Sequence, residues 1–206
     1  MLENITLFLS LDNGASWENI SELENEYITG VIQDSIDDNK LYAIARSAIY
    51  QSSDSGNDWT STKYNFTITK NSLKFNLENQ KTLVIGKECN FTCTDNLYIS
   101  NNKELNFTKA LSNVHKCVFF NYPNKNTIFC IQRNLNGNTL LRSIDDFGTF
   151  DKVFLSGNPT DIIVDEFKLI IPTVGETRND LWISTDGNIF TKTAYSVTEE
   201  NNINQV

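Results

Sequence analysis

A short turn motif recurs along the chain, and it constrains the possible folds more than any other feature. A complete copy has a serine, an aspartate two residues later, a glycine two residues further on and a tryptophan three residues beyond the glycine. The starting serines, at positions 10, 52, 100, 143 and 184, lie 41 to 48 residues apart, which is about the length of one four-stranded propeller blade. The five copies comprise Ser10, Asp12, Gly14 and Trp17; Ser52, Asp54, Gly56 and Trp59; Ser100, Asn102 and Phe107; Ser143, Asp145, Gly148 and Phe150; and Ser184, Asp186, Gly187 and Phe190.

Each part of the motif has a mechanical role in a tight hairpin. An aspartate or asparagine side chain can bond backbone amides two residues on, and glycine tolerates a positive φ. The aromatic residue begins the returning strand, and we expect its ring to be buried against the strands of its own blade. Apolar or alternating residues precede every copy, for example residues 97–99 and 181–183. The motif therefore predicts turns between strands, and we expect its residues to hold these turns and to bind no ligand.

The turn resembles the Asp box, which sialidase propellers share with the luminal domains of the sortilin family of vacuolar sorting receptors. A sialidase-like site would need three arginines around a carboxylate, a tyrosine nucleophile with a glutamate partner and usually an Arg-Ile-Pro stretch. The sequence has no Arg-Ile-Pro, and Arg46, Arg133, Arg142 and Arg178 form no pattern that suggests a carboxylate clamp. The boxes at residues 49–56, 97–100 and 141–148, together with cysteines on blade strands, are similar to the sortilin family.

The resemblance implies an all-β fold, a partial β-propeller with about five Asp-box blades of four antiparallel strands. In the sortilin family one propeller has ten blades, so 206 residues correspond to about half of a ring. We expect residues 1–198 to form this partial propeller, with an incomplete first blade, and residues 199–206 to be a disordered polar tail. Alternating residues predict strands at 27–33, 40–45, 81–86, 116–122, 127–133, 150–155, 161–164, 168–171, 180–184 and 190–195.

The four cysteines fall into two local pairs. Cys117 and Cys130 lie symmetrically about a predicted turn at residues 123–124, which would place them on facing strands. Cys89 and Cys93 bracket a three-residue turn. A metal site is a poor fit, because no histidine accompanies the cysteines and no second matching pair follows Cys93. We expect two disulfides and an oxidising compartment; four reduced, buried cysteines are the alternative.

Signals for the cellular compartment point in two directions. Five triplets fit the acceptor pattern for N-linked glycosylation; they begin at Asn4, Asn19, Asn65, Asn90 and Asn106. The N-terminus shows no secretory signal, and there is no run of 18 or more apolar residues. By resemblance the domain belongs in the Golgi or endosome lumen as part of a membrane receptor, whereas the chain as written would be cytosolic or unstable. It could be an excised piece of a larger receptor or a truncated gene copy.

Charge and residue content argue against several function classes. The net charge is −9, from 17 basic and 26 acidic residues that are scattered along the chain, which disfavours binding to nucleic acid. The single histidine, His115, has no partner that the sequence can place beside it, so no catalytic triad is predicted. No glycine-rich phosphate loop is present. We expect no catalytic residues, no cofactor, no metal and no direct membrane insertion.

The resemblance implies a non-catalytic, sorting-receptor-like luminal domain that binds hydrolase cargo for transport from the Golgi to the endosome or vacuole. Cargo would meet the innermost strands, near residues 28–32, 73–77, 118–120 and 161–164, and the remaining blades of a larger propeller would be a further partner. A sialidase-like Asp-box glycosidase and a non-functional receptor remnant are the alternatives. Half of a ring would also expose two apolar blade faces, so we expect the isolated chain to be poorly soluble or partly unfolded.

Overall fold

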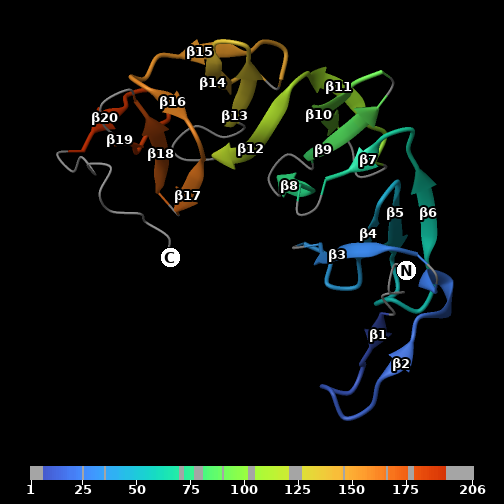
Figure 1. The fold of residues 1–206 in the computed structure, drawn as a ribbon. Helices are drawn as coiled ribbons and strands as arrows, with labels where there is room; N and C mark the ends of the chain where they lie inside the picture. The colour runs from blue at the N-terminus through green and yellow to red at the C-terminus, as the bar shows by residue number, and fades with distance from the viewer. Residues whose placement is uncertain are drawn as a thin grey trace. The chain divides into compact units, whose positions relative to one another are not determined.

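In the computed structural model almost all of the regular secondary structure is short antiparallel strands (Figure 1). It describes residues 7–24, 26–34, 36–69, 72–76, 81–89, 91–101, 105–120, 127–145, 147–165, 167–175 and 179–193. The helical part of these ranges is one 3-10 turn, η1 (Ser21–Leu23). Contacts divide the chain into two compact units, residues 1–73 with 86–93, and residues 74–85 with 94–206. Each unit is described below by itself.

The first unit contains two complete sheets. The first sheet pairs β1 (Phe8–Leu9) with β2 (Glu18–Asn19). The second sheet has the order β3 (Ile28–Gln33), β4 (Leu41–Ala45), β5 (Ala48–Ser52) and β6 (Thr60–Lys63). One apolar core serves this region, because Ile20, Leu23, Ile28, Ala43 and Tyr50 pack together with Leu9 and Trp59 at its margin.

The third sheet is crossed by the boundary between the units. Its order is β11 (Thr108–Leu111), β10 (Cys93–Ser100), β9 (Lys81–Cys89) and β7 (Thr67–Ile68), and β8 (Lys74–Asn76) also pairs with β9. β7 pairs with the end of β9 that belongs to the first unit, at Gly86 and Lys87. β8 pairs with the start of β9, in the second unit.

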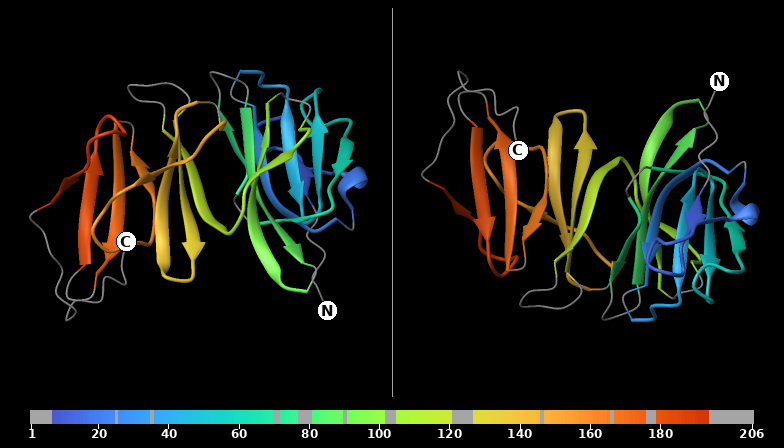
Figure 2. Two further views of the ribbon diagram at one scale, coloured as in Figure 1. Left: turned by 90° about the horizontal axis from the view of Figure 1, so that it is seen from above. Right: turned by 90° about the horizontal axis from the view of Figure 1, so that it is seen from below.

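The second unit holds two further sheets of the same kind. The fourth sheet has the order β12 (Val114–Phe120), β13 (Thr127–Asn134), β14 (Gly137–Ser143) and β15 (Asp151–Val153). The fifth has the order β16 (Asn158–Pro159), β18 (Lys168–Val174), β19 (Asn179–Ser184) and β20 (Thr191–Lys192), and β17 (Ile163–Asp165) also pairs with β18. Figure 2 shows the strands of both sheets from above and below.

Strand β13 shows how successive sheets of the second unit share their cores. Ile128 and Cys130 lie in an apolar cluster with residues of the third sheet, whereas Phe129 and Ile131 lie in a cluster with residues of the fifth. Successive side chains of a strand point to opposite faces, so a strand buried on both faces needs a continuous apolar run. Residues 128–131 are such a run, and all four are buried.

The predicted all-β fold of four-stranded antiparallel sheets is confirmed. The predicted strand at 150–155 is reduced to β15, and of the predicted strand at 190–195 the described residues 190–193 contain β20. Residues 199–206, predicted to be a disordered tail, lie outside the described residues. Within the described ranges, no helix is long and apolar enough to span a bilayer.

Candidate functional site: box turns and interrupted inner strands

The first two box turns share one hydrogen-bond pattern. The serine hydroxyl donates to the aspartate, from Ser10 to Asp12 at 2.9 Å and from Ser52 to Asp54 at 2.7 Å. The same serine oxygen accepts the amide of the box glycine, at 2.7 Å for Gly14 and 2.8 Å for Gly56. Both glycines have a positive φ, 88° and 97°. The carboxylate also accepts the amide four residues on, whereas the sequence predicted a bond to the amide two residues on.

The fourth box keeps this hydrogen-bond pattern, but the residue with the positive φ is not its glycine. Ser143 donates to Asp145, as in the complete boxes, but its oxygen accepts the amide of Phe147 at 3.1 Å. Phe147 has φ 72°, whereas Gly148, expected to supply the positive φ, is not among the residues with a positive φ. Counting from the serine, Phe147 occupies the position of Gly14 and Gly56, so the assignment of Gly148 to this role was wrong.

The third and fifth boxes depart further from the complete motif. In the fifth, Ser184 accepts the amide of Gly187, three residues on, and Asp186 accepts those of Asn188 and Ile189. The turn is therefore one residue shorter, although Gly187 still has φ 69°. In the third, Asn102 lies outside the described residues, while Ser100 is buried and Phe107 half-buried.

Hydrogen bonds hold the box carboxylates in their charged form. The hydroxyl and amide of Ser16, with the Ser10 hydroxyl, lower the pKa of Asp12 to about 2. The hydroxyl and amide of Thr149, followed by the Ser143 hydroxyl, do the same for Asp145, whose pKa is also about 2. The pKa values of Asp54 and Asp186 are lowered mainly by backbone amides. A carboxylate whose acceptor sites are taken up by its own turn is suited to holding that turn rather than to acid catalysis.

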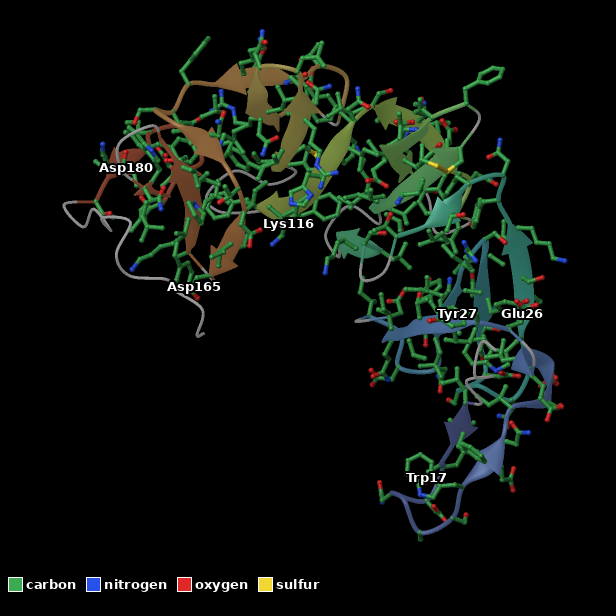
Figure 3. All side chains as sticks on the ribbon, viewed as in Figure 1. Trp17, Glu26, Tyr27, Lys116, Asp165 and Asp180 are labelled. Atoms are coloured by element: carbon green, nitrogen blue, oxygen red, sulfur yellow. A yellow bond between two sulfur atoms is a disulfide. The ribbon has the colours of Figure 1, made fainter. Side chains whose placement is uncertain are left out.

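The aromatic residues that end the boxes differ in burial. Trp59, Phe150 and Phe190 pack against apolar cores, and the Trp59 indole donates to the Gly56 carbonyl at 2.9 Å. Trp17 is 62% exposed on the β1–β2 hairpin (Figure 3). The expectation that this ring is buried was wrong: the first sheet has two described strands, and in the described part of the chain the ring stays exposed.

Two contacts show how a box turn meets the neighbouring sheet. The Gly187 α-carbon lies so close to Phe129 of β13 that a β-carbon there would stand 3.2 Å from the ring. Arg142 of β14 donates to the Gly187 carbonyl at 3.0 Å and to the Asn188 side chain at 2.7 Å. The fifth box is therefore attached to the fourth sheet by packing and by charge-assisted hydrogen bonds.

Both predicted disulfides are present in the structure. Cys117 and Cys130 face each other across β12 and β13, and both are buried. Cys89 and Cys93 close the hairpin between β9 and β10 and are exposed. One bond therefore lies inside a core and the other at a surface turn, within the first unit.

Three of the predicted glycosylation acceptors can be located. Asn19, Asn65 and Asn106 are exposed, and the Asn19 amide donates to Glu24 at 3.2 Å. Asn4 and Asn90 lie outside the described residues. Exposure makes an asparagine accessible to glycosylation, and occupancy of all five positions stays a prediction.

In the second to fifth sheets the first strands, which we call the inner strands, are interrupted. They are β3 in the second sheet, β7 and β8 in the third, β12 in the fourth, and β16 and β17 in the fifth. In β3 the register shifts between Ile28 and Gly30, and in β12 it shifts between Val114 and Lys116. The other two are split into two short strands. Bulges and breaks leave backbone groups out of the ladder and redirect side chains, and they are common beside functional sites.

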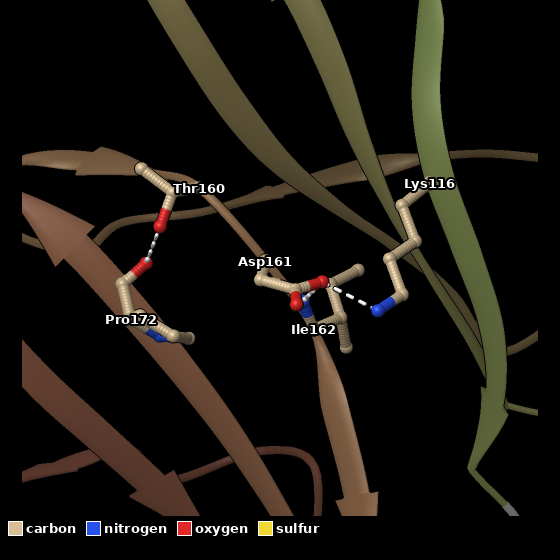
Figure 4. A network of polar contacts seen from close by, with 5 residues as sticks. All are labelled: Lys116, Thr160, Asp161, Ile162 and Pro172. Atoms are coloured by element: carbon tan, nitrogen blue, oxygen red, sulfur yellow. Dashed lines mark hydrogen bonds and ion pairs between the residues drawn. The ribbon is translucent and has the colours of Figure 1, made fainter. Parts of the chain in front are cut away.

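Charged side chains gather at the interruption of β12. The Lys116 ammonium group contacts Asp161, which lies between β16 and β17, with 2.5 Å between nitrogen and oxygen (Figure 4). His115 Nδ1 lies 2.7 Å from Arg133 Nη2, and Arg133 Nη1 lies 3.8 Å from Asp95. Sequence reasoning found no partner for His115, because the contact joins strands β12 and β13 through a bulge.

This polar group does not resemble a hydrolytic triad, since the described partner of His115 is an arginine rather than a serine or cysteine hydroxyl or thiol. Within the described ranges, no cluster of three or more histidine, cysteine or acidic side chains could hold a metal ion. The predicted inner positions 28–32, 118–120 and 161–164 lie on or next to inner strands, and residues 74–76 form β8. Residue 77 lies outside the described residues.

Comparison with solved structures places this fold among β-propellers. The chain is similar to the GH74 xyloglucanase from Xanthomonas campestris, with a TM-score of 0.62 and 10% identity over 88% of this chain and 33% of the enzyme. An ancestral GH74 enzyme gives a TM-score of 0.58 and 14% identity over 90% of this chain and 28% of the enzyme. The chain thus spans about a third or less of these enzymes, and at such identities the likeness shows the fold alone.

Comparison of the sequence itself is more informative about the family. No curated protein matches the chain. The family model Sortilin-Vps10, described as sortilin, neurotensin receptor 3, matches residues 5–206. The match spans all five box turns and both disulfides. The chain therefore belongs to the Sortilin-Vps10 family and forms a sorting-receptor-like propeller domain.

Proposed function

We propose that this domain binds extended peptide segments of protein cargo along its inner strands. The cargo would be soluble hydrolases that a receptor carries from the Golgi to the endosome or vacuole. Family membership supports this proposal, because the family is one of membrane receptors whose propeller is luminal or extracellular. The further support is the state of the inner strands, which lie at one edge of each sheet.

The observation that carries the proposal is the apolar exposure of these edges. Val31 on β3 is 50% exposed, and Ile163 and Val164 on β17 are 46% and 42% exposed. In the described part of the chain, β3 pairs only with β4 and β17 only with β18. A strand with one unpaired edge can accept a peptide as an additional strand, with main-chain hydrogen bonds for affinity and neighbouring side chains for selectivity.

A binding assay with matched variants tests this proposal. The glycosylated chain would be titrated with overlapping fluorescent peptides that cover the precursor of one soluble vacuolar hydrolase. Val164→Lys should weaken the best peptide bound at β17 by about fivefold or more, and Val31→Lys should do the same for the best peptide bound at β3, because a charge replaces an apolar contact. Ile189→Lys is the control, since Ile189 is 71% exposed but lies just before β20, which pairs with β19 and not with an inner strand. Equal loss in all three variants, or no peptide binding, would refute the proposal.

We also propose that the domain has no hydrolase activity. The family consists of receptors, and this supports the proposal, although two similar structures are GH74 enzymes. Purified chain would be incubated with xyloglucan and with a sialyl oligosaccharide, and released sugar would be measured. Turnover above the buffer blank with either substrate would contradict a purely binding role.

A further inference from the structure

The bulge in β12 determines where the side chains of His115 and Lys116 lie. Val114 pairs with Gln132 and Lys116 pairs with Ile131, so His115 is the extra residue without a cross-strand partner. A bulge redirects the side chains around it. His115 approaches Arg133 on β13, while Lys116 reaches Asp161 ahead of β17 in the fifth sheet. Adjacent residues of one bulge therefore make a contact within the fourth sheet and a contact to the fifth.

The contact between His115 and Arg133 requires a neutral imidazole. A guanidinium group only donates hydrogen bonds and keeps its charge throughout the accessible pH range. His115 Nδ1, 2.7 Å from Arg133 Nη2, must therefore be the acceptor, with the ring proton on Nε2. Protonation would place a hydrogen on Nδ1 facing the guanidinium donor, and the contact would become repulsive.

Four charged groups from different parts of the fold influence the pKa of His115. Burial and the Arg133 charge, with a smaller effect from Lys116, hold the pKa of His115 below its usual value. Asp161 and Asp95 act in the opposite direction. A carboxylate that raises the pKa of the imidazole does so by attracting the imidazolium. Because this attraction is mutual, the imidazolium attracts the carboxylate with the same energy. Protonated His115 would thus be drawn to Asp161, the partner of Lys116.

We propose that protonation of His115 breaks its contact with Arg133 and weakens the Lys116–Asp161 link between the fourth and fifth sheets. This inference is independent of the cargo proposal. Its structural consequence falls on β17, because Asp161 also accepts the Ile162 amide at 2.7 Å (Figure 4). Ile162 is 1% exposed and packs in the core with Phe120 and Leu169. A displaced Asp161 carboxylate would loosen the start of β17, one of the inner strands.

The first test uses the fact that the chain has one histidine, so its imidazole NMR signals need no assignment by mutation. At pH of about 7.5 the nitrogen shifts should report the tautomer protonated on Nε2, and the titration midpoint should lie below about 6.5. Arg133→Gln should raise the midpoint, since it removes a positive neighbour, and Asp161→Asn should lower it. The opposite tautomer, or a midpoint that neither variant shifts, would overturn the inference.

The second test measures the link itself by amide hydrogen exchange at residues 162–165, corrected for the intrinsic pH dependence. Exchange in the full chain should rise about threefold to tenfold between pH of about 7.5 and about 5, the change expected for loss of one hydrogen-bonded contact. His115→Gln keeps an acceptor for Arg133 but cannot be protonated in this range, so its exchange should not rise. Lys152→Gln, an exposed change on β15, should behave like the unmodified chain. A rise of equal size in His115→Gln would disprove the coupling.

Discussion

The first and second box turns carry the same four residues and make nearly the same hydrogen bonds, yet their surroundings differ. Ser52 is 1% exposed and Trp59 packs in a core, whereas Ser10 is half-buried and Trp17 is 62% exposed. A β-carbon on Gly56 would stand 3.1 Å from Leu9, but one on Gly14 would meet only Trp17 at 3.8 Å. The comparison shows that the turn forms from local hydrogen bonds, while burial depends on the strands beyond it.

The largest difference between the two boxes is expected when their glycines are replaced by alanine, because both variants introduce backbone strain but one of them also introduces crowding. Both positions have a positive φ, which costs an L-residue about 1–2 kcal/mol. Gly56→Ala adds crowding against Leu9, so its total loss of unfolding free energy should be about 2–4 kcal/mol. Gly14→Ala should lose only the strain. Denaturant unfolding of the two variants measures this difference, and equal losses would show that Leu9 moves aside without cost.

Truncation of the tryptophans tests burial directly. Trp59→Ala removes a half-buried ring and the hydrogen bond to the Gly56 carbonyl, and should cost about 2–3 kcal/mol. Trp17→Ala should cost less than about 0.5 kcal/mol, because an exposed side chain gains little from folding. Indole fluorescence and denaturant midpoints would be compared. A large loss in Trp17→Ala would mean that another surface covers this ring in solution.

Replacement of the box serines should again destabilise the second box more than the first, but by a smaller difference. Ser52→Ala leaves the buried Gly56 amide without its acceptor and should cost about 1–2 kcal/mol. Ser10→Ala exposes the Gly14 amide to water, which can replace the lost bond, so about 0.5 kcal/mol is expected. The thermal unfolding midpoints of both variants would be measured. Ser16→Ala, another substitution at an exposed position of the first box, serves as the reference. The reverse order would contradict the role of burial.

The smallest expected effect is a loss of stability in acid, where the carboxylates of the box turns become protonated. The pKa of Asp12 is lowered from its usual value of 3.8 to about 2, so its contribution to stability is present above pH of about 4 and is lost as pH falls toward about 2. Asp145 should behave alike. Carboxyl NMR titration of the full chain, with Asp12→Asn to assign the signal, measures the value. A midpoint at the usual value would mean that the turn does not hold in solution.

Much of the fold could be predicted because its signals are local. The Asx-type turn chemistry repeats with the period of one sheet, and cysteines placed symmetrically about a turn face each other on adjacent strands. The interruption at His115 could not be predicted, since a bulge is defined by the register between two strands. Nor could the use of Phe147 in place of a glycine, because its left-handed φ is compensated by packing beside Phe119 and the core of the second unit.

The sequence by itself determined the repeating unit, its hairpins, its disulfide pairs and its family, because each depends on residues close together in the chain or on a pattern repeated along it. Only the tertiary structure decided which box ring is buried, which inner strand is broken, and which charges meet at Lys116, Asp161, His115 and Arg133. These features depend on how one sheet packs against the next. Such contacts join residues far apart in the chain, as Lys116 and Asp161 are at a separation of 45 positions, and no local pattern records them.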